Sequence, residues 1–94
     1  MNKIEEIFVS NKPPEKYVTA FLFAKSKGKD EIHIIGRGNN VKRCIDVVSI
    51  LLRDYLKLEN KDDCEIIIGS EPFENRYVST ILIKLRGLES GVTS

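Results

Sequence analysis

The chain has 94 residues, and its 15 Lys and Arg side chains nearly balance its 14 Asp and Glu side chains, which gives a formal net charge of +1. This length predicts one domain over residues 1–94, and no apolar run approaches the roughly 20 residues that a membrane span needs. The first residues lack the pattern of a signal peptide, so we expect a cytoplasmic protein. Nucleic-acid-binding domains are often strongly basic. If this chain is one of them, its positive charge must gather on one face.

The N-terminal third of the sequence predicts a strand, a helix and a second strand. Residues 7–9 form a short apolar run that the prolines at 13–14 end, because proline has no N–H for a strand ladder. From Tyr17 onward apolar residues recur at helical spacing, and Gly28 is a good C-cap, so a helix is expected between the prolines and this glycine. Residues 31–35 are then expected to form the second strand.

A glycine-rich loop, residues 36–40, ends this strand and leads into a second helix. Either Asn39 or Asn40 can cap the helix. We expect the helix over residues 41–56, because their apolar side chains recur at the spacing i, i+3, i+4, i+7 and form a wide stripe. The polar residues 59–63 are expected to form a loop after it.

The C-terminal third predicts two strands, residues 64–68 and 77–85, joined by a hairpin connection over residues 69–76. The small residues 87–94 are expected to form a flexible tail. The resulting order is βαβαββ, and right-handed crossovers place both helices on one face of the sheet. Because the segment 78–83 is long and apolar, we place it inside the sheet. This predicts an α/β (α+β) two-layer sandwich with a mixed four-stranded sheet of order 1-2-4-3.

The sequence offers little for catalysis or metal binding. The single histidine, His33, lies between two isoleucines in mid-strand, where a structural role is typical. Cys44 and Cys64 have no CxxC partner and no histidine at zinc-ligand spacing, so we expect two small buried side chains, no metal and no cofactor. No nucleophile stands beside a base. We therefore predict no catalytic residue, no small-molecule substrate and no enzyme.

The glycine-rich loop is the best candidate for binding an anion. A loop between a strand and a helix N-terminus presents backbone N–H groups and the positive end of the helix dipole. Arg37 adds a fork of donors that suits phosphate, and Lys42 and Arg43 follow, although cations there slightly disfavour the helix. A tight turn with solubilising charge is one alternative. A small phosphate-handling enzyme of the acylphosphatase type, using Arg37 and Asn40, is another.

The turn after the first strand should lie beside this loop. The first two strands are expected to be parallel, so their carboxyl ends meet at one edge of the sheet, where ligands of open α/β sheets bind. Lys12 would then join the cations of the loop. Together with Arg76 in the hairpin, a weaker candidate, these residues form the predicted patch: Lys12, Arg37, Gly38, Asn39, Asn40, Lys42, Arg43 and Arg76.

With these residues in view, the chain resembles the Alba family of archaeal chromatin proteins over residues 7–86. The resemblance rests on short motifs in a consistent order: Lys12-Pro13 with Tyr17-Val18, Gly36-Arg37-Gly38 with Asp46, Gly69-Ser70, and Val78-Ser79-Thr80-Ile81. It implies the βαβαββ fold, which the C-terminal domain of translation initiation factor three shares. It also implies a dimer that binds DNA and RNA with little sequence preference.

Several positions depart from the pattern of this family. Asn11 stands where members often carry the first of two lysines whose acetylation tunes affinity, and Asn39 stands where they often carry a second basic residue. Residues 71–77 form a shorter hairpin than in the best-known members, and Glu71 and Glu74 make it acidic. Such a hairpin should contact the minor groove more weakly or differently. The chain therefore resembles a divergent paralogue within the family.

These observations lead to one main hypothesis of function and one alternative. The main hypothesis is non-sequence-specific binding of double-stranded DNA and/or RNA through the phosphate backbone, by an archaeal chromatin or RNA-associated protein that is cytoplasmic and associated with the chromosome. A backbone grip does not read bases, so DNA and RNA both stay open. The alternative, motivated by the low net charge and the missing lysine, is a dimerisation partner of a more basic Alba paralogue.

We also expect a homodimer, or a heterodimer with such a paralogue. The apolar stripe of the second helix is wide, and the fourth strand offers further apolar side chains, so part of this surface should pair across a two-fold axis. The predicted contact residues are Leu52, Tyr55, Leu56, Ile81 and Ile83. The family resemblance further implies that Tyr55 mediates contacts between dimers.

Overall fold

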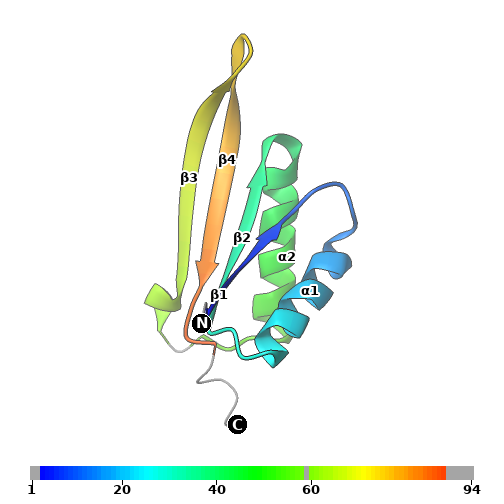
Figure 1. Ribbon diagram of the computed structural model, residues 1–94, viewed down its shortest axis with the longest axis vertical. Helices are drawn as coiled ribbons and strands as arrows, with labels where there is room; N and C mark the ends of the chain where they lie inside the picture. Colours follow the sequence, from blue (N-terminus) through cyan, green and yellow to red (C-terminus); the bar gives the residue numbers. More distant parts are fainter. Residues whose placement is uncertain (1–2, 59, 89–94) are drawn as a thin grey trace.

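Four strands form one sheet in the computed structural model of the protein, which describes residues 3–58 and 60–88. The sheet order is β1-β2-β4-β3, with β1 and β2 parallel and the other two pairs antiparallel (Figure 1). The elements in chain order are β1 (Ile4–Phe8), α1 (Pro14–Ser26), β2 (Glu31–Arg37), the 3-10 turn η1 (Gly38–Asn40), α2 (Val41–Asp54), the 3-10 turn η2 (Lys61–Asp63), β3 (Cys64–Phe73) and β4 (Arg76–Leu85). This architecture confirms the predicted fold class and strand order.

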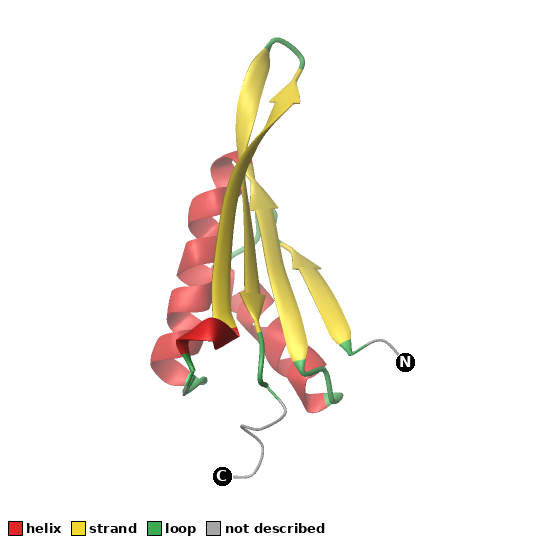
Figure 2. Ribbon diagram, turned by 90° about the vertical axis from the view of Figure 1, so that its left-hand side faces the viewer, coloured by secondary structure: helices red, strands yellow, loops and turns green. Residues whose placement is uncertain are grey.

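Both helices lie on the same side of the sheet, and the opposite face is open (Figure 2). Burial along β2 alternates residue by residue, as expected for a strand with one face in the core. The buried face of the sheet supplies Ile7, Val9, Ile32, Ile34, Ile81, Ile83 and Leu85, and the helices supply Tyr17, Val18, Phe21, Ala24, Cys44, Val47, Val48 and Leu51. The two layers therefore enclose one apolar core, and the sheet face away from the helices is left to contact solvent or a ligand.

The side chains of β4 that were expected at a dimer contact lie inside this core. Ile81 and Ile83 are only 3% and 1% exposed, so the prediction that they contact a second copy was wrong. Their register partners on β3 are Ile68 and Ile66, which share the same sheet face but are 74% and 55% exposed. The reason is that α2 packs over β2 and β4 and leaves β3 beyond its reach (Figure 1).

The expected hairpin connection over residues 69–76 is a long two-stranded arm, because β3 continues to Phe73 and β4 begins at Arg76. Each strand has ten residues, and only Glu74 and Asn75 join them. Beyond the pair Arg37 and Thr80, β4 no longer pairs with β2, so residues 70–79 form an arm that extends past the body of the protein (Figure 1). Pro72 is tolerated because β3 is an edge strand, where one side of the backbone needs no partner.

The chain end departs from the expected tail over residues 87–94. Leu88 is 2% exposed within the core, and its N–H donates to the carbonyl oxygen of Asp30 at 3.2 Å. Residue 88 is therefore anchored, and residues 89–94 lie outside the described part of the chain. At the second helix the difference is smaller, since α2 ends at Asp54 and not at residue 56.

Candidate nucleic-acid interface

The turn after β1 and the start of α2 are joined directly, as their position at one sheet edge predicts. The Nη1 atom of Arg43 donates to the carbonyl oxygen of Ser10 at 2.9 Å and to Oδ1 of Asn40 at 3.0 Å. The N–H of Val9 donates to the carbonyl oxygen of Ile35 at 2.8 Å, which carries the pairing of β1 and β2 past the end of β1. Arg43 thus holds the Lys12 turn against the glycine-rich loop.

The side chain of Tyr17 on α1 holds the same turn by hydrogen bonds. Its side chain is buried, and its hydroxyl oxygen accepts the N–H of Ser10 at 2.9 Å and the N–H of Lys12 at 3.2 Å. Burial raises the pKa of Tyr17, but the hydrogen bonds from Ser10 and Lys12 outweigh it and leave the pKa below its ordinary value. The sequence placed Tyr17 at the apolar start of a helix and in the Lys12-Pro13 motif, but it did not indicate that the phenol hydrogen-bonds the turn. A tyrosine on the buried face of a helix predicts a nearby hydrogen-bond partner, because a buried hydroxyl needs one.

The asparagines of the glycine-rich loop do not cap α2 in the expected way. Asn40 occupies the N-cap position, but its side chain makes no capping hydrogen bond and accepts from Arg43 instead. Asn39 lies in η1 and is exposed. The N-terminus of α2 is therefore left without a side-chain cap, which keeps it open to an anion.

Gly36 serves the packing of α2 and does not belong to an anion cradle. It is buried, and a Cβ atom there would lie 2.3 Å from Sγ of Cys44 and 3.1 Å from the carbonyl oxygen of Asn40. The absence of a side chain lets the first turn of α2 approach the end of β2. Burial also raises the pKa of Cys44 to about 11, which suits the small structural side chain that was predicted.

Arg37 points to the open face of the sheet and reaches toward the arm. Its Nη1 atom donates to Oε1 of Glu71 at 2.9 Å, and its guanidinium carbon lies 5.6 Å from the ring centre of Phe73. The side chains of Arg37 and Glu71 are about half exposed, at 54% and 48%. The sequence did not indicate this pair, because its members are 34 residues apart and meet only through the pairing of β2, β4 and β3.

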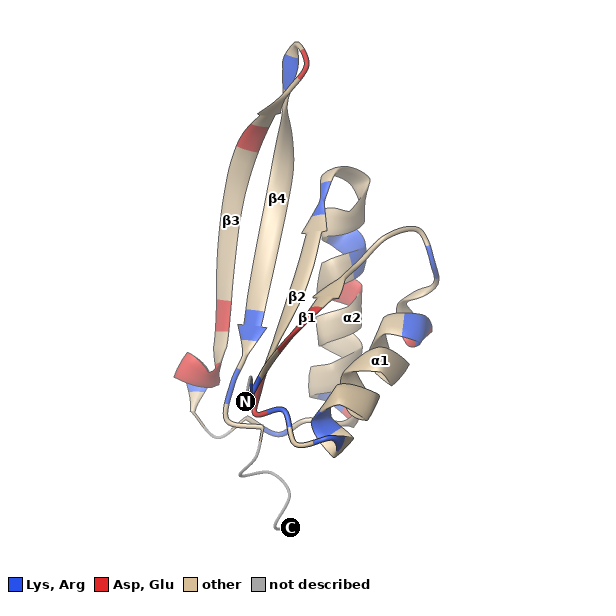
Figure 3. Ribbon diagram, in the orientation of Figure 1, with Lys and Arg blue, Asp and Glu red and all other residues tan. Residues whose placement is uncertain are grey.

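The remaining cations of the predicted patch differ in their surroundings. Lys42 is highly exposed and pairs with Asp46 one helical turn away, at 3.2 Å. Arg76 stands near the tip of the arm, and a recess that it lines also contains Gly38 and Asn39, so the arm and the loop share a surface. Lys12 is exposed on its turn. Figure 3 shows Lys and Arg where β2 ends and α2 begins, with acidic residues interspersed.

The described residues give little support for a metal site or for a catalytic histidine. Within residues 3–58 and 60–88, no three His, Cys, Asp or Glu side chains are grouped to hold a metal ion. Nε2 of His33 lies 2.6 Å from Oε2 of Glu31, which gives this histidine a structural partner on the same strand. In the same part of the chain, no helix has the length and apolar character to cross a membrane.

A comparison with protein-family models assigns this chain to a family. The model of the family named Alba matches residues 5–62. The chain belongs to the Alba family. The DNA/RNA-binding protein Alba of Nanoarchaeum equitans is 33% identical over 85 residues, which cover 85% of this chain and 94% of that protein. A protein of the same name from Methanoculleus marisnigri is 35% identical over 71 residues, covering 76% of each chain.

A solved structure agrees with the sequence comparisons. Alba from Thermoplasma volcanium superposes with a TM-score of 0.67 at 27% identity, covering 86% of this chain and 98% of that chain. The Alba fold expected from the short motifs is thereby confirmed.

Proposed function

We propose that this Alba protein binds double-stranded DNA and/or RNA through the phosphate backbone, without sequence preference and without enzymatic activity, as a cytoplasmic chromatin or RNA-associated protein. The observation that carries the proposal is the Arg43 side chain, which bonds Ser10 of one loop and Asn40 of the other. It holds exposed Lys12 beside an uncapped helix N-terminus. The relatives named DNA/RNA-binding protein Alba support the same reading.

The geometry suits phosphate better than bases. Lysine and arginine side chains on two loops, together with a helix N-terminus, recognise charge and shape but do not present a pattern of donors and acceptors for base edges. The arm adds Arg76 beside Gly38 and Asn39, so a duplex lying along this edge would meet both the loops and the arm. Binding of this kind tolerates any sequence and weakens as salt rises.

A dimer would present two such patches, and the surface that suits it lies between α2 and β3. Ile45 and Leu52 on α2 are exposed, and so are Ile66 and Ile68 on the uncovered face of β3. Exposed apolar side chains on neighbouring elements are typical of an interface between copies. Of the residues first predicted, Leu52 and Tyr55 remain exposed, whereas Leu56 is half-buried against the core.

Replacing Arg37 with alanine tests the phosphate contact. We expect the variant to bind every duplex sequence at least about tenfold more weakly, because the dimer loses two charge-assisted contacts and no base readout. If each subunit neutralises about three phosphates, and the variant loses one of them in each subunit, the log–log salt slope on B-DNA should flatten from roughly −5.4 to roughly −3.6. Titration of generic duplex DNA and RNA at several salt concentrations, by fluorescence anisotropy, measures both quantities.

His33→Ala is the control for this experiment, because it changes the same strand but lies outside the patch. It should leave the affinity and the salt slope unchanged. If Arg37→Ala also leaves both unchanged while its circular dichroism matches the parent protein, the binding face lies elsewhere.

Glu71 should weaken binding, because its carboxylate holds Arg37 at 2.9 Å and would repel an approaching phosphate. We expect Glu71→Gln to strengthen duplex binding by about threefold, in keeping with the modest energy of an exposed ion pair. Glu65→Gln is a matched control, since Glu65 lies on the same face of β3 and pairs with Arg86 at 2.6 Å. Equal affinities of the two variants would mean that Glu71 does not restrain Arg37.

A second candidate function is a dimerisation partner of a more basic Alba paralogue. It is favoured by the ion pairs of Arg37 with Glu71 and of Lys42 with Asp46, which neutralise two cations of the predicted patch. An electrophoretic mobility shift with generic duplex DNA and RNA separates the two candidates. Clean binding by the protein alone favours the first, and binding only in the presence of a basic paralogue favours the second.

A further inference from the structure

An apolar row crosses the open face of the sheet, where a two-layer fold usually presents polar side chains. Phe8, Ile35, Leu82 and Ile67 stand directly opposite one another on β1, β2, β4 and β3. Phe8 is 65% exposed and Ile67 is 40% exposed. No core requirement explains this row, because the core lies on the other face of the sheet.

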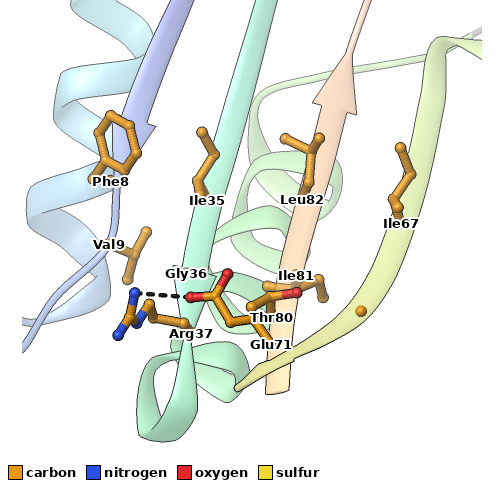
Figure 4. A pocket seen from close by; sticks show the side chains of 11 residues that line it. Phe8, Val9, Ile35, Gly36, Arg37, Ile67, Glu71, Thr80, Ile81 and Leu82 are labelled. Carbon is orange, nitrogen blue, oxygen red and sulfur yellow. Dashed lines mark hydrogen bonds and ion pairs between the residues drawn. The ribbon is translucent and has the colours of Figure 1, made fainter. Parts of the chain in front are cut away.

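A recess of about 600 Å³ lies over this row. On its arm side the next residues across the sheet are Arg37, Thr80 and Gly69, and the glycine leaves the floor open above β3. The ion pair of Arg37 and Glu71 stands at this end of the recess (Figure 4). The volume is in the range of pockets that hold small organic groups.

The lining matches a planar group with apolar faces and polar edges. The four apolar side chains offer a floor and a wall, and the Thr80 hydroxyl and the Arg37–Glu71 pair offer donors and acceptors at one end. A nucleobase has this chemistry, and unpaired bases bind proteins by packing against aromatic side chains while their edges donate and accept hydrogen bonds.

Arg37 connects the recess to the phosphate patch. It ends β2 and is followed immediately by Gly38 of the glycine-rich loop, yet its side chain closes the recess. A ligand that places a base in the recess would therefore place its phosphate near the loop. We propose that the recess binds an unpaired base of a single-stranded nucleic acid whose backbone follows the patch. This inference rests on the proposed function. It adds a preference for single strands over duplexes, because the bases of a duplex stay stacked and cannot enter the recess.

A second copy of the chain is a poorer occupant. The row of side chains on the other side of the apolar row is Glu6, His33, Lys84 and Glu65, which mixes charges of both signs. Burying these groups against an identical surface would leave charges without matched partners. The exposed isoleucines between α2 and β3 offer a surface for a second copy without that cost.

Replacing Phe8 with alanine tests the recess, and Phe23→Ala is its control. The two phenylalanines are 65% and 64% exposed, but Phe23 lies on α1, away from the open face. We expect Phe8→Ala to weaken binding of a short oligouridylate and of the matching oligodeoxythymidylate by about tenfold, the usual effect of losing one stacking contact. Binding of a short duplex should change less than about twofold. Phe23→Ala should leave all three affinities unchanged.

A second variant, Ile67→Glu, places a carboxylate in the recess from an exposed edge-strand position. It should also weaken single-strand binding and spare duplex binding, and circular dichroism checks that both variants are folded. Comparing the ribo- and deoxyribo-oligonucleotides shows which of the two single strands the recess prefers.

Three results for Phe8→Ala would overturn the proposal. Its affinity for single strands could equal that of Phe23→Ala, its affinity for duplex could fall as much as its affinity for single strands, or its oligomeric state could differ from that of the parent protein. Failure of the proposed function has a different signature. In that case the parent protein would not bind duplex at all, whether or not Phe8→Ala alters single-strand binding.

Discussion

Gly36→Ala should lower the free energy of unfolding by about 3 kcal/mol, the range expected for an overpacked core. The added Cβ would meet Sγ of Cys44 at 2.3 Å and the Asn40 carbonyl oxygen at 3.1 Å, so the first turn of α2 must move away from the sheet. This is a large fraction of the stability of a small domain, which is typically about 5–15 kcal/mol. Urea denaturation followed by circular dichroism measures the loss.

The double variant Gly36→Ala/Cys44→Ala separates this clash from other effects of the substitution. Cys44→Ala alone should cost about 1 kcal/mol, because it removes one small buried group. In the double variant the sulfur is gone, so the combined loss should be smaller than the sum of the single losses by at least about 1 kcal/mol. Rescue should be incomplete because the contact with the Asn40 carbonyl oxygen remains. Simple additivity would show that Cys44 does not restrict this position.

Ile68→Glu should convert the proposed dimer to monomers, because Ile68, at 74%, is the most exposed of the four side chains proposed for its interface. A charge buried at the centre of an interface is strongly unfavourable unless it is paired. Light scattering at micromolar concentration should then give only the 10.7 kDa species, whereas the parent protein should give twice this mass. Duplex affinity should fall by roughly a hundredfold, because two linked patches become one.

Ile67→Glu is the matched control for the dimer. Its side chain lies on the neighbouring position of β3 but faces the open side of the sheet. The same charge there should leave the dimer intact. If Ile67→Glu dissociates the protein and Ile68→Glu does not, the copies meet through the open sheet face, and both the proposed dimer surface and the recess proposal would fail.

The two glycines of the Gly-Arg-Gly motif show how one short sequence serves two purposes. Gly36 lets α2 approach the sheet, whereas Gly38 has a φ of +61° and turns the chain into η1. The residue between them carries the charge. The selection of Arg37 as a phosphate contact stays a prediction. Gly36, in contrast, is required by the packing of α2 against β2, which the motif alone does not indicate.

The sequence by itself determined the elements and their order. The apolar residues around Ile32 and Ile34 predicted a strand, and the helical spacing of Cys44, Val48 and Leu51 predicted a helix, because side-chain periods differ between strands and helices. The apolar segment 78–83 placed β4 inside the sheet, since a central strand is covered on at least one face along its length. The neighbourhood of Lys12 and Arg43 followed from topology alone, because parallel strands bring their following loops to one edge.

The tertiary structure alone decided which apolar and charged side chains reach the surface. The register of β3 and β4 puts Ile83 and Ile66 on the same face of the sheet, and the position of α2 decides that the first is covered and the second is not. The extent of the arm depended on pairing between β3 and β4, which overrode the turn-forming residues at 69–72. The ion pair of Arg37 and Glu71 depended on the register of three strands. Each of these features arises from contacts between distant segments, which local sequence patterns do not encode.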